Sequence, residues 1–482
     1  MLISFNPARV CSVCRVAAMA LGLTAGTASF QAATAQITLR EAIRQADRSA
    51  YGNRIAAAET AAQTAQSIAP LKGILPTVHF EAGYIRTTDP IGVFGSTLRQ
   101  RSVSQANFDP QRLNFPGPLG NHQGAVVVEQ PLINVDAWIG RRSADYAADA
   151  SRASEEWTKL STRVDVVRAY YGAVLADERA STLRSADRAA YAHVSQAEAL
   201  VRQGIATKSD ALLASVRAGE IDAQLVEAEG AASTSQRGLA VLLGQNAPDA
   251  SVFLVAPAAL PSGDRIRALV SDDTAAIIPV ERADVQAAVR GLDAARANAK
   301  RARSLFMPRV NSFARYDWNS AIRPFAGDRN WTIGIMATWT PFTNPADIAD
   351  LRTAGARGDA ARAQAEAAQA NARLEVEQTR TALQVALARL SIAERAVAQS
   401  AEAHRIVGRK YEGGLAQIAE LLDAQAVETQ SALGFSQARW SAIVAAAERL
   451  RALGRDPGAL EALDATPPVK AAPVGARRQE TP

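Results

Sequence analysis

The stretch Gly204-Ile-Ala-Thr-Lys-Ser-Asp210 recurs in altered form as Gly414-Leu-Ala-Gln-Ile-Ala-Glu420, 210 residues further along the chain. Leu243-Gly244 recurs as Leu453-Gly454 at the same offset. An internal repeat indicates a structural unit that is built more than once. Two long copies indicate a duplication rather than a solenoid, because solenoids use short units in larger numbers.

The first 35 residues have the pattern of a secretory leader. Arg9 and Arg15 provide a positive start, an apolar stretch runs from Val16 to Ala28, and Ala33-Thr34-Ala35 offers a small-residue cleavage site before Gln36. A membrane anchor is the alternative, but the apolar stretch is too short and too rich in Gly, Ala and Thr to span a bilayer well. We therefore expect the leader to be a removed signal peptide.

Both cysteines, Cys11 and Cys14, lie in the leader and precede its apolar stretch. A lipid-anchored Cys would follow that stretch, so no lipid anchor is expected there, and the mature chain would contain no disulfide. Loss of Arg9 and Arg15 takes the formal charge from +5 to +3. This charge is too small to indicate nucleic acid as a partner.

The sequence lacks the signatures of catalysis and metal binding. Its four histidines, at positions 79, 122, 193 and 404, have no metal-ligand spacing, and we expect His193 and His404 to lie on solvated helix faces. Neither a Gly-rich phosphate loop nor a Gly-x-Ser-x-Gly motif occurs. We expect a protein that is not an enzyme and that has no cofactor and no metal site.

The first copy is expected at 36–244. Thr38-Leu-Arg-Glu41 has the pattern of a capping box, which starts a helical stretch that runs to about Leu75. The apolar period then changes to two, which indicates a β-hairpin at about 76–131. We expect its first strand from about 77 to 84, a long loop from about 89 to 124, and a second strand at 125–130 that ends at Pro131.

A proline-free helical stretch follows the first hairpin, from about Asn134 to Gln203. At 1.5 Å per residue this is a helix on the order of 100 Å long. It is expected to turn at the tip 204–207 and to return as a second helix to Gly244. A heptad-like spacing of apolar residues, typical of a coiled-coil seam, is kept by Leu160, Val164, Val167, Tyr171 and Val174.

The second copy is expected at 281–454 and repeats the same order of elements. Its hairpin lies at about 308–341, and its long helix pair turns at 413–417. Residues 245–280, which contain several prolines, would connect the copies. The Pro-, Ala- and Arg-rich tail at 455–482 is expected to be disordered.

The last strand carries the clearest membrane pattern. Trp331 and Trp339 bound an apolar face, with small polar residues on the opposite face, as in strands of outer-membrane barrels. The preceding strand agrees, since Trp318 would lie outward with its apolar neighbours and Arg315 inward. We expect Trp318, Trp331 and Trp339 to be membrane-interface aromatics, and the charged inward face to line a water-filled lumen.

Four strands cannot close a barrel, and open strand edges are not tolerated in lipid. The fold class that follows is mainly α with membrane β, built as a homotrimer. Four strands per chain, twelve in total, would form a trimeric β-barrel that is continuous with a long α-helical barrel.

The chain resembles the TolC-like outer-membrane efflux protein family over nearly all of its mature length. The resemblance rests on the order of the duplicated elements, on Arg282-Ala-Asp284-Val-Gln-Ala-Ala, on Met307-Pro308-Arg-Val, and on Gly-x-Ala followed by Asp210 or Glu420. It implies an efflux channel in the cell outer membrane, with a periplasmic extension. It also implies a periplasmic adaptor protein and an inner-membrane pump as partners, besides outer-membrane lipid.

Two alternatives stay open from the sequence. The first is the outer-membrane channel of a type I protein secretion system. The second, from another class, is a secreted coiled-coil structural protein, because the heptads alone would suffice for it. The two alternating hairpins argue against this second alternative.

Two sites follow for the far end of the long helices. An exposed aliphatic residue beside a turn glycine predicts a docking surface at two tips, and the resemblance implies that the adaptor binds there. The tips are Gly204, Ile205, Ala206 and Thr207 in the first copy, and Gly414, Leu415, Ala416 and Gln417 in the second. Asp210, Glu420 and Asp423 are candidates for a periplasmic gate, since rings of carboxylates select cations. The alternative role of these acids is to complement the helix dipole in the first turns.

Overall fold

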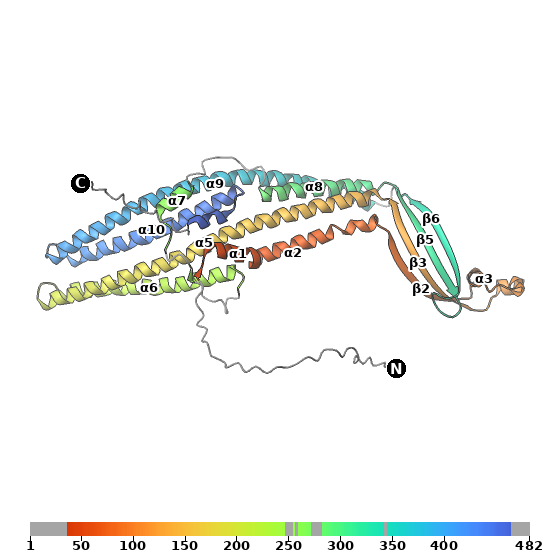
Figure 1. The fold of residues 1–482 in the computed structure, drawn as a ribbon, viewed down its shortest axis with the longest axis horizontal. Coiled ribbons are helices and arrows are strands. Elements are labelled where there is room, and N and C mark those ends of the chain that lie inside the picture. Colours follow the sequence, from red (N-terminus) through yellow and green to blue (C-terminus); the bar gives the residue numbers. More distant parts are fainter. Residues whose placement is uncertain (1–35, 246–253, 256–258, 271–281, 342–344, 464–482) are drawn as a thin grey trace, which may run out of the picture.

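The computed structural model describes residues 36–245, 254–255, 259–270, 282–341 and 345–463. The expected leader with both cysteines, most of the connector and residues 464–482 of the expected tail lie outside the described residues. The described chain forms a long rod with a four-stranded sheet at one end and two helical turns at the other (Figure 1).

Two helices of 68 residues each, α5 (Val135–Arg202) and α9 (Pro345–Glu412), run along the rod. They return as α6 (Lys208–Leu242) and α10 (Ile418–Ala452), which have 35 residues each. α6 packs on α5, α5 also packs on α10, and α10 packs on α9. These helices and the four-stranded sheet confirm the predicted fold class at the level of one chain.

Both helical turns end their first helix in the same way. Gly204 and Gly414 have φ angles of +75° and +69°, which favour glycine. Ile205 donates its backbone N–H to the carbonyl of Leu200 at 2.9 Å, and the equivalent bond in the second copy is 2.8 Å long. This is the Schellman pattern of helix termination. The duplication seen in the sequence is therefore also a duplication of backbone hydrogen bonds.

The first helical stretch, predicted to run to about Leu75, is interrupted at Ala50. Ala50 has an extended ψ of 133°, which separates α1 (Leu39–Ser49) from α2 (Tyr51–Gln66). The buried amide of Asn53 donates to the carbonyl of Ala46 at 3.1 Å and so satisfies the end of α1. A short 3₁₀ helix, η1 (Ala69–Gly73), then leads into the sheet.

The four long strands form one antiparallel sheet in the order β2-β3-β5-β6. Their bounds are Thr77–Thr87 for β2, Leu119–Ile133 for β3, Arg309–Ser320 for β5 and Asp328–Thr338 for β6. β3 is longer than the predicted strand at 125–130 and continues through Pro131. The pairing with β5 is irregular between Pro131 and Ile133, which accommodates a residue without an N–H.

The predicted loop from 89 to 124 contains helices, so its description as irregular was wrong. They are α3 (Pro90–Arg99), η2 (Gln105–Phe108) and α4 (Pro110–Asn114). Asp89 accepts the backbone N–H of Gly92 at 2.6 Å, and Asp109 accepts that of Gln111 at 2.9 Å. In both cases a proline at the first helical position follows the capping Asp, a combination that favours helix initiation.

The main apolar core lies midway along the rod, where several short elements pack around α5 and α10. They are β1 (Gln36–Ile37), β4 (Leu254–Val255), α7 (Gly263–Val270) and η3 (Pro457–Leu463). α8 (Ala283–Ser304) packs on α5 and α9 nearer the sheet (Figure 1). β1 and β4 form a parallel pair. Leu460 and Leu463 of η3 are buried, so the prediction of disorder is wrong for 457–463. Two buried leucines anchor this short segment to the core.

Candidate functional site

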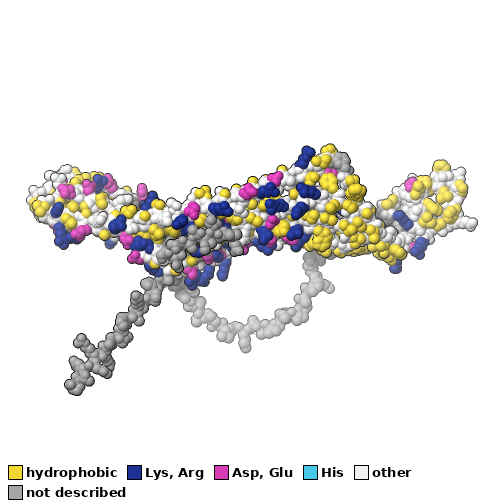
Figure 2. Space-filling model, turned by 90° about the horizontal axis from the view of Figure 1, so that it is seen from above, with side chains coloured by type: hydrophobic (Ala, Val, Ile, Leu, Met, Phe, Trp, Pro, Cys, Tyr) yellow, Lys and Arg dark blue, Asp and Glu magenta, His cyan; other side chains and the backbone are white. Residues whose placement is uncertain are grey.

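One face of the sheet is apolar across all four strands. Phe80 pairs with Val126, Val126 pairs with Tyr316, and Tyr316 pairs with Trp331, so one row of side chains crosses the sheet. Adjacent rows on this face contain Val78, Val128, Ala314, Ile333, Ile335 and Ala337. On one side of the molecule, hydrophobic side chains gather toward the sheet end, whereas charged ones are scattered over the helices (Figure 2).

The three tryptophans of this region differ in exposure. Trp331 is 70 % exposed and Trp339 64 % exposed. Trp339 lies just beyond β6, and its indole N–H donates to the carbonyl of Phe306 at 3.0 Å. Trp318 is half-buried, with its ring centroid 4.8 Å from that of Tyr316 and 5.6 Å from that of Phe325. Trp318 therefore presents less surface than the other two tryptophans.

The opposite face of the sheet is polar and charged. Arg315 of β5 forms an ion pair with Glu81 of β2 at 2.8 Å, across the intervening strand β3. Asn121 donates to Asn319 at 2.9 Å near the far end of the sheet. These charged and polar groups are suited to a surface in contact with water, because burying them in an apolar core would cost free energy.

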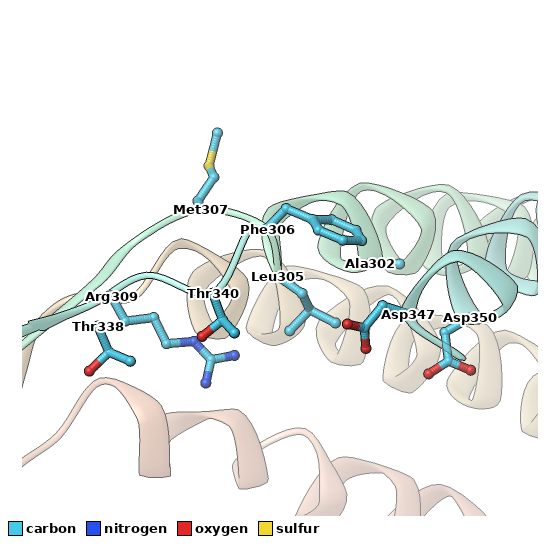
Figure 3. Close-up of a pocket in the computed structure, with 9 residues that line it drawn as sticks. All are labelled: Ala302, Leu305, Phe306, Met307, Arg309, Thr338, Thr340, Asp347 and Asp350. Carbon is cyan, nitrogen blue, oxygen red and sulfur yellow. The ribbon is translucent and has the colours of Figure 1, made fainter. Parts of the chain in front are cut away.

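A small pocket of about 240 Å³ lies where the sheet meets the helices (Figure 3). Arg309 at the start of β5 lies at this junction, and its guanidinium donates to both carboxylate oxygens of Asp136 in α5, at 3.1 and 2.9 Å. Asp347 and Asp350 line the pocket from the first turns of α9, where acidic residues complement the helix dipole. The ion pair between Arg309 and Asp136 fastens β5 to α5.

The two helical turns share one cleft of about 790 Å³ at the end of the rod. Ile205 and Ala206 line it from the first copy, and Gly414 and Ala416 from the second. Ile205 is 69 % exposed and Leu415 82 % exposed. A Cβ built on Gly204 or Gly414 would meet nothing within 4 Å, so both turns are open to approach from outside. The structure thus brings the two predicted tips together at one surface.

The three candidate gate acids have different surroundings. Asp210 accepts hydrogen bonds from the backbone N–H and the hydroxyl of Thr207, both at 2.9 Å, and so completes the capping box of α6. Glu420 holds the equivalent place in α10, but Gln417 makes no side-chain cap. Asp423 is exposed, and its charge, after that of Glu220, raises the pKa of Arg217 on α6.

Behind the tips, Tyr411 of α9 packs in a small cluster with Ala197, Ala214, Ile418 and Leu421. Its hydroxyl is buried and has no hydrogen-bond partner among the described residues. Burial, together with the neighbouring charge of Asp210, raises the pKa of this hydroxyl.

His193 and His404 do not lie on solvated faces, contrary to the prediction. They face each other between α5 and α9, with ring centroids 6.1 Å apart. His404 Nδ1 lies 2.5 Å from a carboxylate oxygen of Glu428 on α10. His193 Nε2 is buried and has no hydrogen-bond partner in the part of the chain that the structure describes. Burial, and then the charge of His404, lower the pKa of His193. The two histidines meet where the helix pair α5–α6 packs against the helix pair α9–α10. The spacing of residues along the chain could not predict this contact.

A second group that the sequence did not place is a cluster around Trp157. Arg282, whose side chain is 2 % exposed, binds Asp284 at 2.7 Å and Glu375 at 2.6 Å. Its guanidinium carbon lies 4.5 Å from the centre of the Trp157 ring, and that of Arg451 lies 5.2 Å from it. The cluster joins α5, α8, α9 and α10. The sequence signal was the Arg-Ala-Asp motif, whose buried ion pairs show that it is a structural element.

The described residues contain neither a helix that is long and apolar enough to cross a membrane nor a group of three or more potential metal ligands. In the cleft Asp210 caps α6, and at the junction pocket Arg309 is paired with Asp136. The geometry offers two surfaces, the apolar sheet face and the tips.

Comparison with protein families matches residues 54–245 and 278–455 to the model of the outer membrane efflux protein family. Comparison with curated proteins finds no match. Solved structures with a similar fold include the outer-membrane channel OprN, at 21 % identity, 87 % coverage of this chain, 90 % of that chain and a TM-score of 0.71.

Two further channels have the same fold. The CmeC outer membrane channel of Campylobacter jejuni is 16 % identical, covers 86 % of this chain and 85 % of its own, and has a TM-score of 0.71. The outer membrane protein VceC of Vibrio cholerae is 21 % identical, covers 87 % and 96 %, and has a TM-score of 0.70.

Proposed function

Because the chain belongs to the outer membrane efflux protein family, we propose that three copies close around one axis into an export channel. The observation that carries this proposal is the apolar face of the sheet, which continues over four strands to two unpaired edges, β2 and β6. In lipid, unpaired backbone groups at such edges cost several kcal/mol each. Pairing β6 of one copy with β2 of the next removes both edges, and twelve strands suffice for a lumen.

The helical end supports the same closure. α6 and α9 are the outer members of the row of long helices, and both carry exposed apolar residues at heptad spacing. On α6 these residues are Leu212 and Val226, and on α9 they are Val385, Ile392 and Ile406. A ring of three copies brings α6 of one chain beside α9 of the next, where these residues form a second coiled-coil seam.

The charged face of the sheet then lines the lumen. Glu81 and Arg315 form an ion pair there, while Ile333 and Ile335 face lipid from the other side. A water-filled lumen is favourable for these charges, as in other membrane barrels. Trp331 and Trp339 would lie at the two membrane interfaces. The Trp318 ring packs edge-on against the Phe325 ring.

For the far end of the rod we propose docking of a periplasmic adaptor protein, which links the channel to an inner-membrane pump. The support is the open cleft between the tips, which Ile205 lines, and the exposure of both Ile205 and Leu415. Three chains present six tips, so a threefold channel offers a pseudo-sixfold surface. Exposed aliphatic side chains next to glycine allow close approach of a partner backbone.

Asp210, Glu420 and Asp423 are proposed to ring the lumen at this end and to favour cations. Glu420 and Asp423 are exposed in the single chain and are the stronger candidates. Asp210 already accepts two hydrogen bonds from Thr207, so part of its charge serves the cap of α6.

Conductance tests the channel proposal. The purified protein, added to a planar lipid bilayer, should produce discrete ion-conducting steps, and the sample should contain a heat-sensitive oligomer that needs detergent for extraction. A protein that inserts into the bilayer but never conducts, or one that stays soluble without detergent, would contradict the proposal.

A further inference from the structure

The apolar face of the sheet ends in an arginine on each edge strand, at the end away from the helices. On β2 the row Phe80, Ala82, Tyr84 continues to Arg86, and on β6 Arg329 follows Trp331 at the same period of two. Each arginine lies one residue inside the outer end of its strand, at Thr87 or Asp328. Both side chains are exposed.

Neither arginine has an acidic partner among the described residues, unlike Arg315 and Arg101 near them. Arg315 pairs with Glu81 at 2.8 Å, and Arg101 lies 3.6 Å from Asp328. Among the described residues, no carboxylate forms an ion pair with Arg86 or Arg329. A cation on a membrane-facing surface without a counter-charge is unfavourable, unless an anion of the membrane itself supplies one.

The other end of the same face has no such charge. There β2 begins its apolar row at Val78, and β6 ends its row at Ala337. Arg309 at this level points to the opposite face, where it binds Asp136. The two membrane leaflets therefore meet different chemistry, and only the leaflet away from the helices meets free arginines.

We propose that Arg86 and Arg329 bind the phosphate group of a lipid in the outward leaflet, namely a phosphate-bearing lipid A. The planar guanidinium matches phosphate through two parallel N–H donors. Arg329 lies about 7 Å beyond Trp331 along the strand, and interfacial tryptophans lie at headgroup level. The arginine is thus at the depth of the lipid phosphates.

The site is shared between copies, a point that rests on the proposed trimer. When β6 of one chain pairs with β2 of the next, Arg329 and the neighbouring chain's Arg86 flank the same seam at its outer end. Three equivalent sites then result, each made of two chains. A lipid bound there would brace the seam on which barrel closure depends.

The test compares lipid retention by three forms of the full chain in nanodiscs of phosphatidylcholine. They are the wild type, the double variant Arg86→Gln with Arg329→Gln, and the control Arg112→Gln. Arg112 is exposed on α4 at the same end of the molecule but lies outside the strand face. The probe is bisphosphorylated lipid A, with dephosphorylated lipid A and inorganic phosphate as competitors. Binding is measured by native mass spectrometry, and chain number is read from the same spectra.

We expect the double variant to bind lipid A roughly tenfold or more weakly, while Arg112→Gln binds like the wild type. The site is overturned if the double variant binds lipid A as tightly as the wild type does. It is also overturned if the wild type binds dephosphorylated lipid A as tightly as it binds bisphosphorylated lipid A. Displacement by millimolar inorganic phosphate would identify an anion site without lipid preference and overturn the lipid assignment. A wild type that binds lipid A as a single chain would overturn the shared seam and the trimer, while leaving phosphate binding intact. Loss of lipid with the oligomer preserved supports the proposal.

Discussion

The middle of the rod and its helical tip are built from the same four long helices, yet they pack differently. In the middle, large side chains such as Tyr170, Tyr171 and Ile443 are fully buried. Toward the tip the shared cluster is small and holds six buried residues. Regions with fewer buried apolar contacts open at lower free energy. The middle is thus a rigid collar, whereas the tip region is suited to docking and movement.

The largest effect is expected where the tip meets a partner. Ile205→Glu combined with Leu415→Glu places charge on both exposed aliphatic positions and should reduce export to the background of a deletion strain. Because both side chains are solvent-exposed, folding and membrane insertion should be unchanged. The matched control, Ile205→Val with Leu415→Ile, keeps the surface apolar and should keep export. Full export by the glutamate variant would rule out docking at the tips.

Substitutions in the collar are expected to change the stability of the protein rather than its docking. Tyr171→Ala removes a fully buried ring that contacts Tyr170 edge-on, with centroids 5.2 Å apart, and should lower the free energy of unfolding by about 3–5 kcal/mol. Chemical denaturation in detergent would measure the loss. A change below about 1 kcal/mol would show that the middle is no more tightly packed than the tip, and the comparison would fail.

A smaller effect is expected from the acids of the tip. Asp210→Asn, Glu420→Gln and Asp423→Asn together remove charge but keep hydrogen-bonding groups, so the cap at Thr207 is retained. If these carboxylates ring the lumen, the preference for cations should fall several-fold while the conducting oligomer persists. Ion selectivity would be measured from reversal potentials in planar bilayers. Unchanged selectivity would assign the three acids to helix capping and surface charge alone.

Several elements of the fold could be predicted from the sequence, because they depend on local patterns of residues. The offset between Gly204 and Gly414 located both turns, and the alternation around Trp331 located the apolar face of the sheet. The Asp-Pro pairs at 89–90 and 109–110 also carried a helix signal, but the many Gly, Pro and Asn residues around them suggested a loop. Local signals of both kinds were present, and the capping signal was the correct one.

Contacts between distant segments could not be predicted in this way. The facing of His193 and His404 depends on how α5 lies against α9, and the ring of Trp157 meets Arg282 and Arg451 only after four helices have packed. The burial of Leu460 likewise depends on a groove formed by other elements. Side-chain spacing along one helix contains no information about the neighbouring helix.

The smallest effect concerns pH and distinguishes the tip region from the collar. Burial lowers the pKa of His193 in the folded protein below its ordinary value of 6.5. Between the two pKa values the unfolded chain binds more protons than the folded one, so stability falls as the pH drops below about 6.5 and levels off below the folded pKa. His193→Gln should remove this part of the pH dependence. Hydrogen exchange of amides near residue 193 at pH 7.5 and pH 5.5 would measure the free energy of local opening. If this free energy is the same at the two pH values in both the wild type and the variant, the assignment is contradicted.

Native mass spectrometry of the detergent-extracted protein tests the central claim most directly, because both unpaired edges of the chain depend on closure by other copies. The account predicts a complex of three chains that conducts ions and separates into single chains on heating. A stable, correctly inserted single chain, or a closed assembly of any other number, would contradict a channel of twelve strands formed by pairing β6 with β2 of the next copy.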